Sequence, residues 1–219
     1  MLKLLFVRHA ESIGNAQGRM VGQYHDPLTP RGQDQAQQLA FRLQRYVPTC
    51  IYASPLQRAA ETADILRRSL GALTPITYLD ELQEFQNGIF SGLTWAEAQE
   101  RYPDFCQQLI TNRDWISIPE AETLQSGRDR AERVVNQLLT HRSGELVWVV
   151  SHHWILQHVV SVLLGCDRTW EFPLDHTGLV EVWLDRDRWA MPEQKLNSAL
   201  WHVHRFNDVA HLSSQSEAD

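Results

Sequence analysis

Short apolar runs alternate along this chain with longer amphipathic segments, and this alternation constrains the fold more than any other feature. Short runs rich in apolar and β-branched residues are typical of buried strands, because they are too short for helices. Strands are expected at Leu2–Val7, Cys50–Ala53, Ile76–Leu79, Glu145–Val150, Leu179–Leu184 and Ala199–Phe206, with a hairpin through Asp185–Asp187 joining the last two.

Several of the segments between these runs begin with residues that cap helices. Thr29-Pro30 and Ser54-Pro55 each place a side-chain oxygen before a proline, and Thr94 with Glu97 forms a capping box. Helices are expected from Thr29 to about Tyr46, Ser54 to Leu70, Thr94 to Tyr102, Thr123 to His141 and His153 to Leu164. This alternation predicts an α/β protein, a three-layer α/β/α sandwich with a mostly parallel central sheet.

Length and composition set limits on the class of protein. The 219 residues, 43% of them hydrophobic, suit one domain over residues 1–212, and the Ser-rich tail 213–219 is expected to be disordered. A net charge of −7 argues against nucleic-acid binding and against binding to anionic membranes. The sequence shows no signal peptide, no long apolar span and no paired cysteines, so we expect a cytoplasmic, soluble protein.

Polar residues follow two predicted strands where each strand ends. Arg8 and His9 follow the first strand, and His152 follows the expected strand Glu145–Val150. Arg58 lies early in the helix after Ser54. Two arginines and two histidines can bind a dianionic phosphoryl group and attack it without a metal. Taken singly, each residue is more often a hydrogen-bonded or solvated side chain than a catalytic one.

Five histidines could in principle meet at a metal ion: His25, His176, His202, His204 and His211. Their spacing matches no recognised pattern of metal ligands, so no functional metal is expected. Motifs for a nucleotide-binding loop or a serine nucleophile are also lacking, and no cofactor is expected.

Five ordered segments together resemble those of the histidine phosphatase (phosphoglycerate mutase-like) superfamily, on its phosphatase-type branch. They cover most of the chain and are Leu5–Ser12 with Asn15, Gly22–Thr29 with Gly32, Ser54–Ala59 with Thr62, Leu82–Glu84 with Gly88 and Gly92, and Val149–His152. The sequence departs from the family pattern at Ala10, where glycine is commoner, and at Glu120–Thr123, which keeps a glutamate, Glu122, but no glycine.

The resemblance implies a role for each matching residue. His9 would attack phosphorus and become a phosphohistidine, while Arg8, Arg58 and His152 hold the phosphoryl oxygens. Glu84 would protonate the leaving oxygen and then deprotonate water. Asn15 and the Gly22-Gln23 amides would line the phosphate side of the pocket, and His153 is included because alignment alone decides which residue of the His152-His153 doublet faces the substrate.

The segment between the implied acid and the second histidine bears on the choice between phosphatase and mutase. Glu84 and His152 lie only 68 positions apart, and the expected lid, about Tyr102 to Thr123, carries Trp115 and more acidic than basic residues. We therefore expect a metal-independent phosphomonoesterase for a small, partly apolar organophosphate, acting as a monomer or homodimer. A cofactor-dependent phosphoglycerate mutase and a non-catalytic protein that binds phosphorylated ligands remain the alternatives.

Overall fold

A central six-stranded sheet organises the computed structural model, which describes residues 1–71 and 74–215. The strands lie in the order β3-β2-β4-β1-β5-β6. Strands β1 to β4 run parallel, whereas β5 is antiparallel to both β1 and β6. Their bounds are β1 Leu2–Arg8, β2 Cys50–Ala53, β3 Ile76–Tyr78, β4 Leu146–Ser151, β5 Leu179–Leu184 and β6 Trp201–Asp208. The predicted mostly parallel sheet is confirmed.

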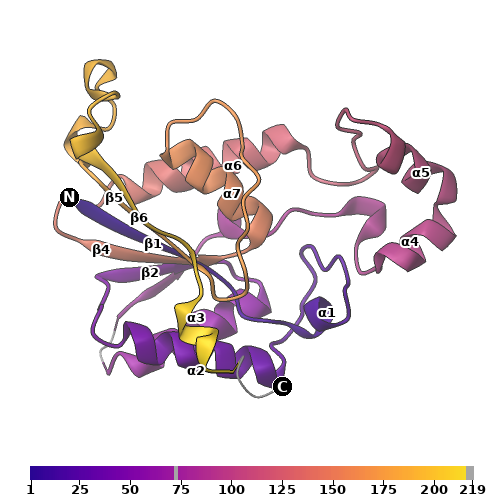
Figure 1. The fold of residues 1–219 in the computed structure, drawn as a ribbon, viewed down its shortest axis with the longest axis horizontal. Coiled ribbons are helices and arrows are strands. Elements are labelled where there is room, and N and C mark those ends of the chain that lie inside the picture. Colours follow the sequence, from indigo (N-terminus) through magenta and orange to yellow (C-terminus); the bar gives the residue numbers. More distant parts are fainter. Residues whose placement is uncertain (72–73, 216–219) are drawn as a thin grey trace.

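Helices cover both faces of this sheet (Figure 1). Helices α2 and α3 pack on one face, α6 and α7 pack on the other, and α4 and α5 form a lobe at one end. The helices are α1 Ile13–Ala16, α2 Pro30–Leu43, α3 Gln57–Ser69, α4 Trp95–Arg101, α5 Pro103–Thr111, α6 Leu124–Leu138 and α7 His153–Leu163. This is the predicted three-layer sandwich.

Alternation along β1 explains how one strand serves two cores. Leu4 and Phe6 point into the cluster beneath α6 and α7, whereas Leu5 and Val7 point into the cluster beneath α2 and α3. All four side chains are fully buried, as expected of a central strand covered on both faces. The two cores hold the sheet in place between the helix layers, and the sheet in turn positions the residues at the ends of its strands.

Some predicted element boundaries are wrong. Ser54 does not cap α3, which begins at Gln57 without a side-chain cap; the Ser54 hydroxyl instead accepts from the Leu56 N–H at 3.2 Å and contacts the ring of His152. The last two strands do pair, but residues 185–200 connect them through three short 3₁₀ turns instead of a tight hairpin. A 3₁₀ turn at Ala210–Gln215 ends the described chain, and residues 216–219 of the predicted disordered tail lie outside it.

The α4–α5 lobe belongs to a segment whose two ends meet. Asn87 and Ala121 form an isolated antiparallel bridge, and the Glu122 N–H donates to the Gln86 carbonyl at 3.0 Å. We call the segment between them, residues 88–120, the lid; it begins earlier in the chain than the lid expected at about Tyr102 to Thr123. Sequence reasoning missed α5 within it, although Pro103 occupies the first position of that helix, a common helix-starting signal.

Within the described residues, no helix combines the length and the apolar character needed to cross a lipid bilayer.

Candidate active site

His9 lies directly after β1, buried at 3% exposure. Its Nδ1 is 2.7 Å from the Ala10 carbonyl oxygen, which can only accept a hydrogen bond, so Nδ1 carries the proton. Nε2 is therefore unprotonated, and its lone pair accepts a hydrogen bond of 3.2 Å from the Arg58 Nε–H, which attack on a substrate would have to displace. Burial, followed by the nearby His152, Arg58 and Arg8, holds the His9 pKa well below its ordinary value. The ring is therefore neutral near pH 7.

Two arginines flank the His9 ring. Arg58 is buried in α3 and donates to the backbone carbonyls of Gly22 and Tyr24, at 2.7 and 3.2 Å. Arg8, the last residue of β1, donates to the Leu174 carbonyl at 2.7 Å, and its buried Nε has no partner within the described structure. Burial lowers the pKa of both guanidiniums from a very high ordinary value, so both remain cations.

His152 lies behind His9, with 4.9 Å between the ring centroids. The Ser54 hydroxyl contacts its Nε2 at 2.8 Å, whereas its buried Nδ1 has no hydrogen-bond partner among the described residues. Burial and the charges of Arg58 and Arg8 keep the pKa of His152 well below its ordinary value. A buried ring nitrogen without a partner is costly unless a ligand satisfies it.

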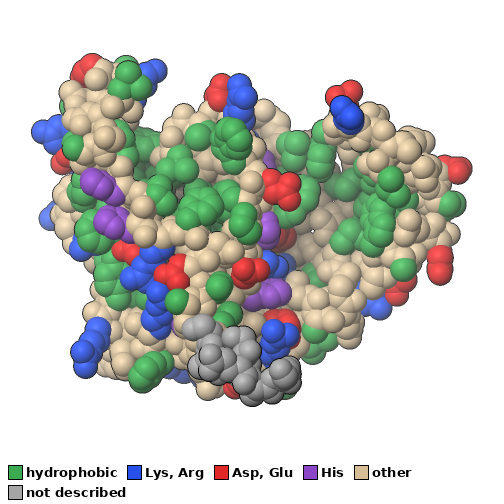
Figure 2. All heavy atoms as spheres, viewed as in Figure 1, with side chains coloured by type: hydrophobic (Ala, Val, Ile, Leu, Met, Phe, Trp, Pro, Cys, Tyr) green, Lys and Arg blue, Asp and Glu red, His purple; other side chains and the backbone are tan. Residues whose placement is uncertain are grey.

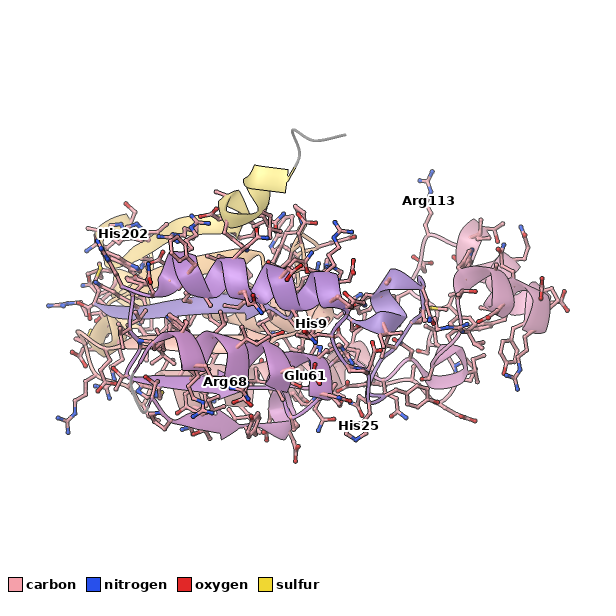
Figure 3. The ribbon with its side chains drawn as sticks, turned by 90° about the horizontal axis from the view of Figure 1, so that it is seen from below. His9, His25, Glu61, Arg68, Arg113 and His202 are labelled. Carbon is pink, nitrogen blue, oxygen red and sulfur yellow. The ribbon has the colours of Figure 1, made fainter. Side chains whose placement is uncertain are left out.

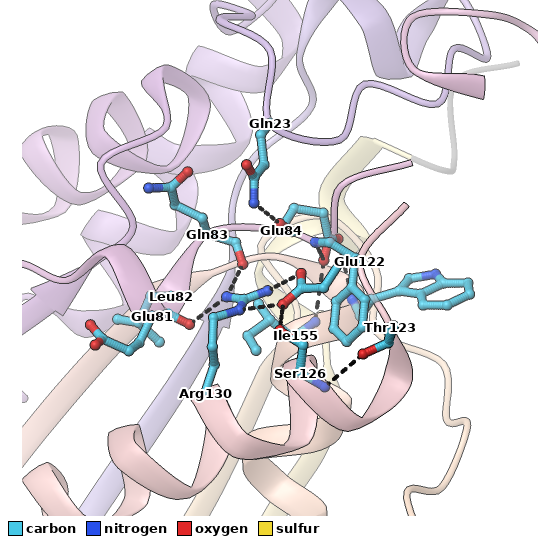
Figure 4. Close-up of polar contacts among 12 residues, drawn as sticks. Gln23, Glu81, Leu82, Gln83, Glu84, Glu122, Thr123, Ser126, Arg130 and Ile155 are labelled. Atoms are coloured by element: carbon cyan, nitrogen blue, oxygen red, sulfur yellow. Dashed lines mark hydrogen bonds and ion pairs between the residues drawn. The ribbon is translucent and has the colours of Figure 1, made fainter. Parts of the chain in front are cut away.

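Glu84 approaches the site from the loop after β3. Its carboxylate accepts from the Phe85 N–H at 3.0 Å and from the Trp154 and Ile155 N–H groups at 3.2 Å each, at the start of α7 (Figure 4). Burial raises the pKa of the Glu84 carboxyl, although these hydrogen bonds and Arg58 oppose the rise. A carboxyl with a raised pKa can carry a proton closer to neutral pH than an ordinary glutamate.

The backbone that leads to Glu84 is held by an arginine from α6. Arg130 donates to the carbonyls of Glu81 and Gln83, at 2.7 and 2.8 Å, and forms a two-pronged ion pair with Glu122 (Figure 4). Both partners of this ion pair are largely buried. Glu122, the glutamate kept in the segment that departs from the family pattern, is therefore bound to Arg130 while also lining the cavity.

A cavity of about 310 Å³ lies at the carboxyl ends of β1 and β4, and the predicted residue His152 is not among the residues that line it. Figure 2 shows the recess between the lobe and the body of the molecule, with hydrophobic side chains on both sides. Of the predicted residues, the cavity is lined by Arg8, His9, Asn15, Gly22, Arg58, Glu84 and His153. Gln23 does not line it, because its amide turns to the backbone carbonyl of Glu84, at 3.0 Å.

The histidine doublet divides between two positions. His152 packs beside His9, and His153 lines the open cavity within 3.5 Å of an Arg8 nitrogen. Sequence reasoning missed His176, whose Nε2 is 3.1 Å from Arg8 and 3.2 Å from Asn15 Oδ1. The sequence suggested His176 only as one of five possible metal ligands. No local signal in the sequence indicates that the loop before β5 reaches the end of β1.

The imagined histidine cluster does not assemble. Figure 3 shows His25 and His202 at well-separated places in the molecule, and His202 stacks instead on its strand neighbour His204. Among the described residues, no group of three or more His, Cys, Asp or Glu side chains is arranged to hold a metal ion.

Comparisons with known proteins agree with this geometry. A family model described as the histidine phosphatase superfamily (branch 1) matches residues 4–196. Phosphoserine phosphatase 1 of Hydrogenobacter thermophilus is 30% identical over 213 residues, covering 96% of this chain and 99% of the relative. A Citrobacter koseri protein named "Probable phosphoglycerate mutase GpmB" is 29% identical, covering 98% and 96%. The α-ribazole phosphatase structure from Shigella flexneri shares the fold, with a TM-score of 0.79 and 23% identity over 95% of this chain and 97% of the other.

Proposed function

Because this chain belongs to the histidine phosphatase superfamily, we propose that it is a metal-independent phosphomonoesterase that works through a phosphohistidine on a small organophosphate. One observation carries the proposal. The unprotonated Nε2 of a neutral His9 accepts a hydrogen bond from Arg58 and lies near the charge of Arg8, in the cavity that Glu84 also lines. A nucleophile, two fixed cations and an acid are the groups that phosphoryl transfer from an ester requires.

The first half of the reaction forms the phosphoenzyme. His9 Nε2 attacks phosphorus, the bond from phosphorus to the ester oxygen breaks, and the departing alkoxide takes the proton of Glu84. Arg8 and Arg58 balance the charge of the phosphoryl oxygens during transfer. If Ser54 donates to Nε2 of His152, the ring proton lies on Nδ1, and this unpartnered N–H can donate to a phosphoryl oxygen.

The second half regenerates the enzyme. Glu84, now a carboxylate, removes a proton from water as the water oxygen attacks phosphorus. The phosphorus–nitrogen bond breaks, His9 recovers its lone pair, and inorganic phosphate leaves. The backbone N–H groups at the start of α7 stabilise the carboxylate between the two steps.

The test is a panel of phosphate esters incubated with the protein in EDTA and assayed for free phosphate, with 3-phosphoglycerate also assayed for isomerisation. We expect phosphate release without added metal. Isomerisation without release would favour the mutase alternative, which the relative named as a mutase supports. Absence of both reactions would favour the non-catalytic alternative.

The phosphoenzyme is tested separately with His9→Ala. This variant should lose at least about 10³-fold in turnover and retain no ³²P label after rapid acid quenching, because the attacking nitrogen is gone. Turnover near that of the unaltered protein would refute His9 as the nucleophile.

A further inference from the structure

The position of Glu84 fixes the side of the cavity from which the alcohol leaves. An acid that protonates the ester oxygen must lie beside that oxygen, so the alcohol extends past Glu84. The Glu84 carboxylate is held by the backbone of Trp154, whose side chain lines the cavity next to it. The residues around Trp154 therefore face the part of the substrate that differs from one phosphate ester to another.

Two partly exposed tryptophans form a wall on this side. Trp154 from α7 and Trp115 from the lid are 43% and 52% exposed, and their ring centroids lie 5.9 Å apart. Trp154 is backed by the buried ring of Phe85, at 5.7 Å. Both tryptophans also line a neighbouring cavity of about 530 Å³, so the wall offers apolar surface to a group that extends beyond the catalytic cavity.

Cations near this wall are already committed. Arg19, at the rim of the catalytic cavity, is bound to Glu97 by two hydrogen bonds of 2.8 and 3.1 Å. Arg128, in the neighbouring cavity, donates to the Cys166 carbonyl and contacts Glu132, whereas its buried Nη1 has no hydrogen-bond partner among the described residues. Arg113 on the lid points away from the body of the molecule (Figure 3).

The remaining groups near the wall are neutral or acidic. Burial lowers the pKa of His153, which keeps its ring neutral. Asp167 and Glu171 add negative charge to the neighbouring cavity. Among the described residues that line the two cavities, each arginine other than the phosphate-binding pair thus has an acidic partner, with which a carboxylate on the alcohol would have to compete.

We propose that Trp115 and Trp154 form a subsite for a planar, uncharged part of the alcohol. The preferred substrates are then phosphate monoesters of alcohols that carry an aromatic or heteroaromatic ring, and esters of hydroxy acids are poorer substrates. This inference rests on the proposed phosphatase function, because it assigns the leaving-group side of that reaction. Ring stacking against an exposed indole gains favourable contact without needing a charge.

The experiment compares esters whose alcohols have similar basicity, so that the chemical step stays matched. We expect kcat/KM for 1-naphthylmethyl phosphate to exceed that for propyl phosphate and for phosphoserine by about tenfold or more. Trp154→Ala and Trp115→Ala should each remove most of this preference, measured as the ratio of kcat/KM for 1-naphthylmethyl phosphate to kcat/KM for propyl phosphate. Trp154→Phe and Trp115→Phe, which keep a planar ring, should restore part of it.

A matched control and a binding measurement separate the possible failures. Trp170 is 58% exposed and lines neither cavity, so Trp170→Ala should leave the preference intact. Calorimetry on the His9→Ala variant measures binding of the same esters without turnover. Preferential naphthylmethyl binding without hydrolysis of any ester would support the subsite and overturn the phosphatase. Hydrolysis with equal losses on all esters in the tryptophan variants would overturn the subsite and keep the phosphatase.

Discussion

At the scale of single residues, the proposed mechanism places opposite requirements on the protons of His9 and Glu84. His9 must be without a proton on Nε2 to attack, and burial beside two arginines lowers its pKa. Glu84 must hold a proton to donate, and burial raises its pKa. The same desolvation acts on both groups, and its sign differs because the charged form is protonated in histidine and deprotonated in glutamate.

The lowered pKa of His9 predicts that its ring stays neutral when free histidine would protonate. Its ¹H–¹³C ring resonance, assigned by its absence in His9→Ala, should not titrate between pH 7 and 6, whereas in the urea-unfolded chain it should titrate near pH 6.5. The folded state then binds fewer protons, so this group lowers stability as pH falls through about 6.5. A midpoint of about 6.5 in the folded chain would contradict the prediction.

The acid role of Glu84 predicts a loss that depends on the leaving group. Glu84→Gln should reduce kcat on alkyl phosphates by about 10²- to 10⁴-fold, because an alkoxide needs a proton to leave. On p-nitrophenyl phosphate, whose leaving group needs little help, transfer to His9 should slow much less, measured as the burst of nitrophenol. Equal losses on both esters would mean that Glu84 positions the substrate instead of protonating it.

Single residues also show where sequence reasoning succeeds and where it ends. Arg8, His9 and His152 could be placed because each follows a strand, and strand ends meet at one edge of a parallel sheet. Ser54 has the local pattern of a helix cap, whereas its hydroxyl contacts the Leu56 N–H and the ring of His152, which is 98 positions away. A contact across the sheet leaves no trace in local spacing.

At the scale of elements, helix α6 packs against Phe85, the ring that supports Trp154 in the tryptophan wall. A methyl group on Gly127 would lie 1.8 Å from the Cζ atom of Phe85, so only glycine allows α6 to approach this ring. Phe85 in turn backs Trp154. Gly127 thus determines how closely α6 approaches Phe85, and through Phe85 it positions Trp154 in the subsite that we assign to the alcohol.

Gly127→Ala should therefore destabilise the protein, although alanine is the better helix former. We expect the free energy of unfolding in urea to fall by about 1–3 kcal/mol, because Phe85 must move from a packed core. Asp129→Ala, at an exposed position of the same helix, should change it by less than about 0.5 kcal/mol. A stabilised Gly127→Ala variant would show that helix propensity outweighs the clash.

Element boundaries were predictable where a local signal controls them. Thr29 and Thr94 each cap a helix as expected, Thr123 caps the helix that was expected to begin there, and Gly165 follows α7 with a positive φ. The connection from β5 to β6 was not predictable, because its three short turns are each too brief to leave a periodic pattern.

At the scale of the whole molecule, the C-terminal strand is tied to the N-terminal half by charge. Arg42 of α2 donates hydrogen bonds of 2.9 and 2.6 Å to the two carboxylate oxygens of Asp208, at the end of β6. The Arg42 guanidinium lowers the pKa of Asp208 to about 2. This pair connects the edge of the sheet to the helix layer beneath it.

The lowered pKa of Asp208 predicts a stabilisation that is lost in acid. The contribution is present above about pH 4, where Asp208 is charged in both states, and it disappears as pH falls toward 2. Asp208→Asn should lower the free energy of unfolding by about 1 kcal/mol at pH 6, given partial solvent screening, and by nearly nothing at pH 2.

The matched control for this prediction is Asp187→Asn, which breaks a more exposed ion pair with Arg186. It should have little effect at either pH. A deficit in Asp208→Asn that stays constant from pH 6 to pH 2 would mean that lost packing, and not charge, explains the change.

The bridge between Asn87 and Ala121 has an evolutionary consequence. Because the lid leaves and rejoins the body at adjacent points, it forms a cassette that can be exchanged or resized without altering the path of the sheet. His9, Arg8, Arg58, Glu84 and His152 all lie outside that cassette, whereas Trp115 lies within it. Transplanting the lid between relatives would therefore exchange preferences for alcohols while leaving the phosphoryl chemistry in place.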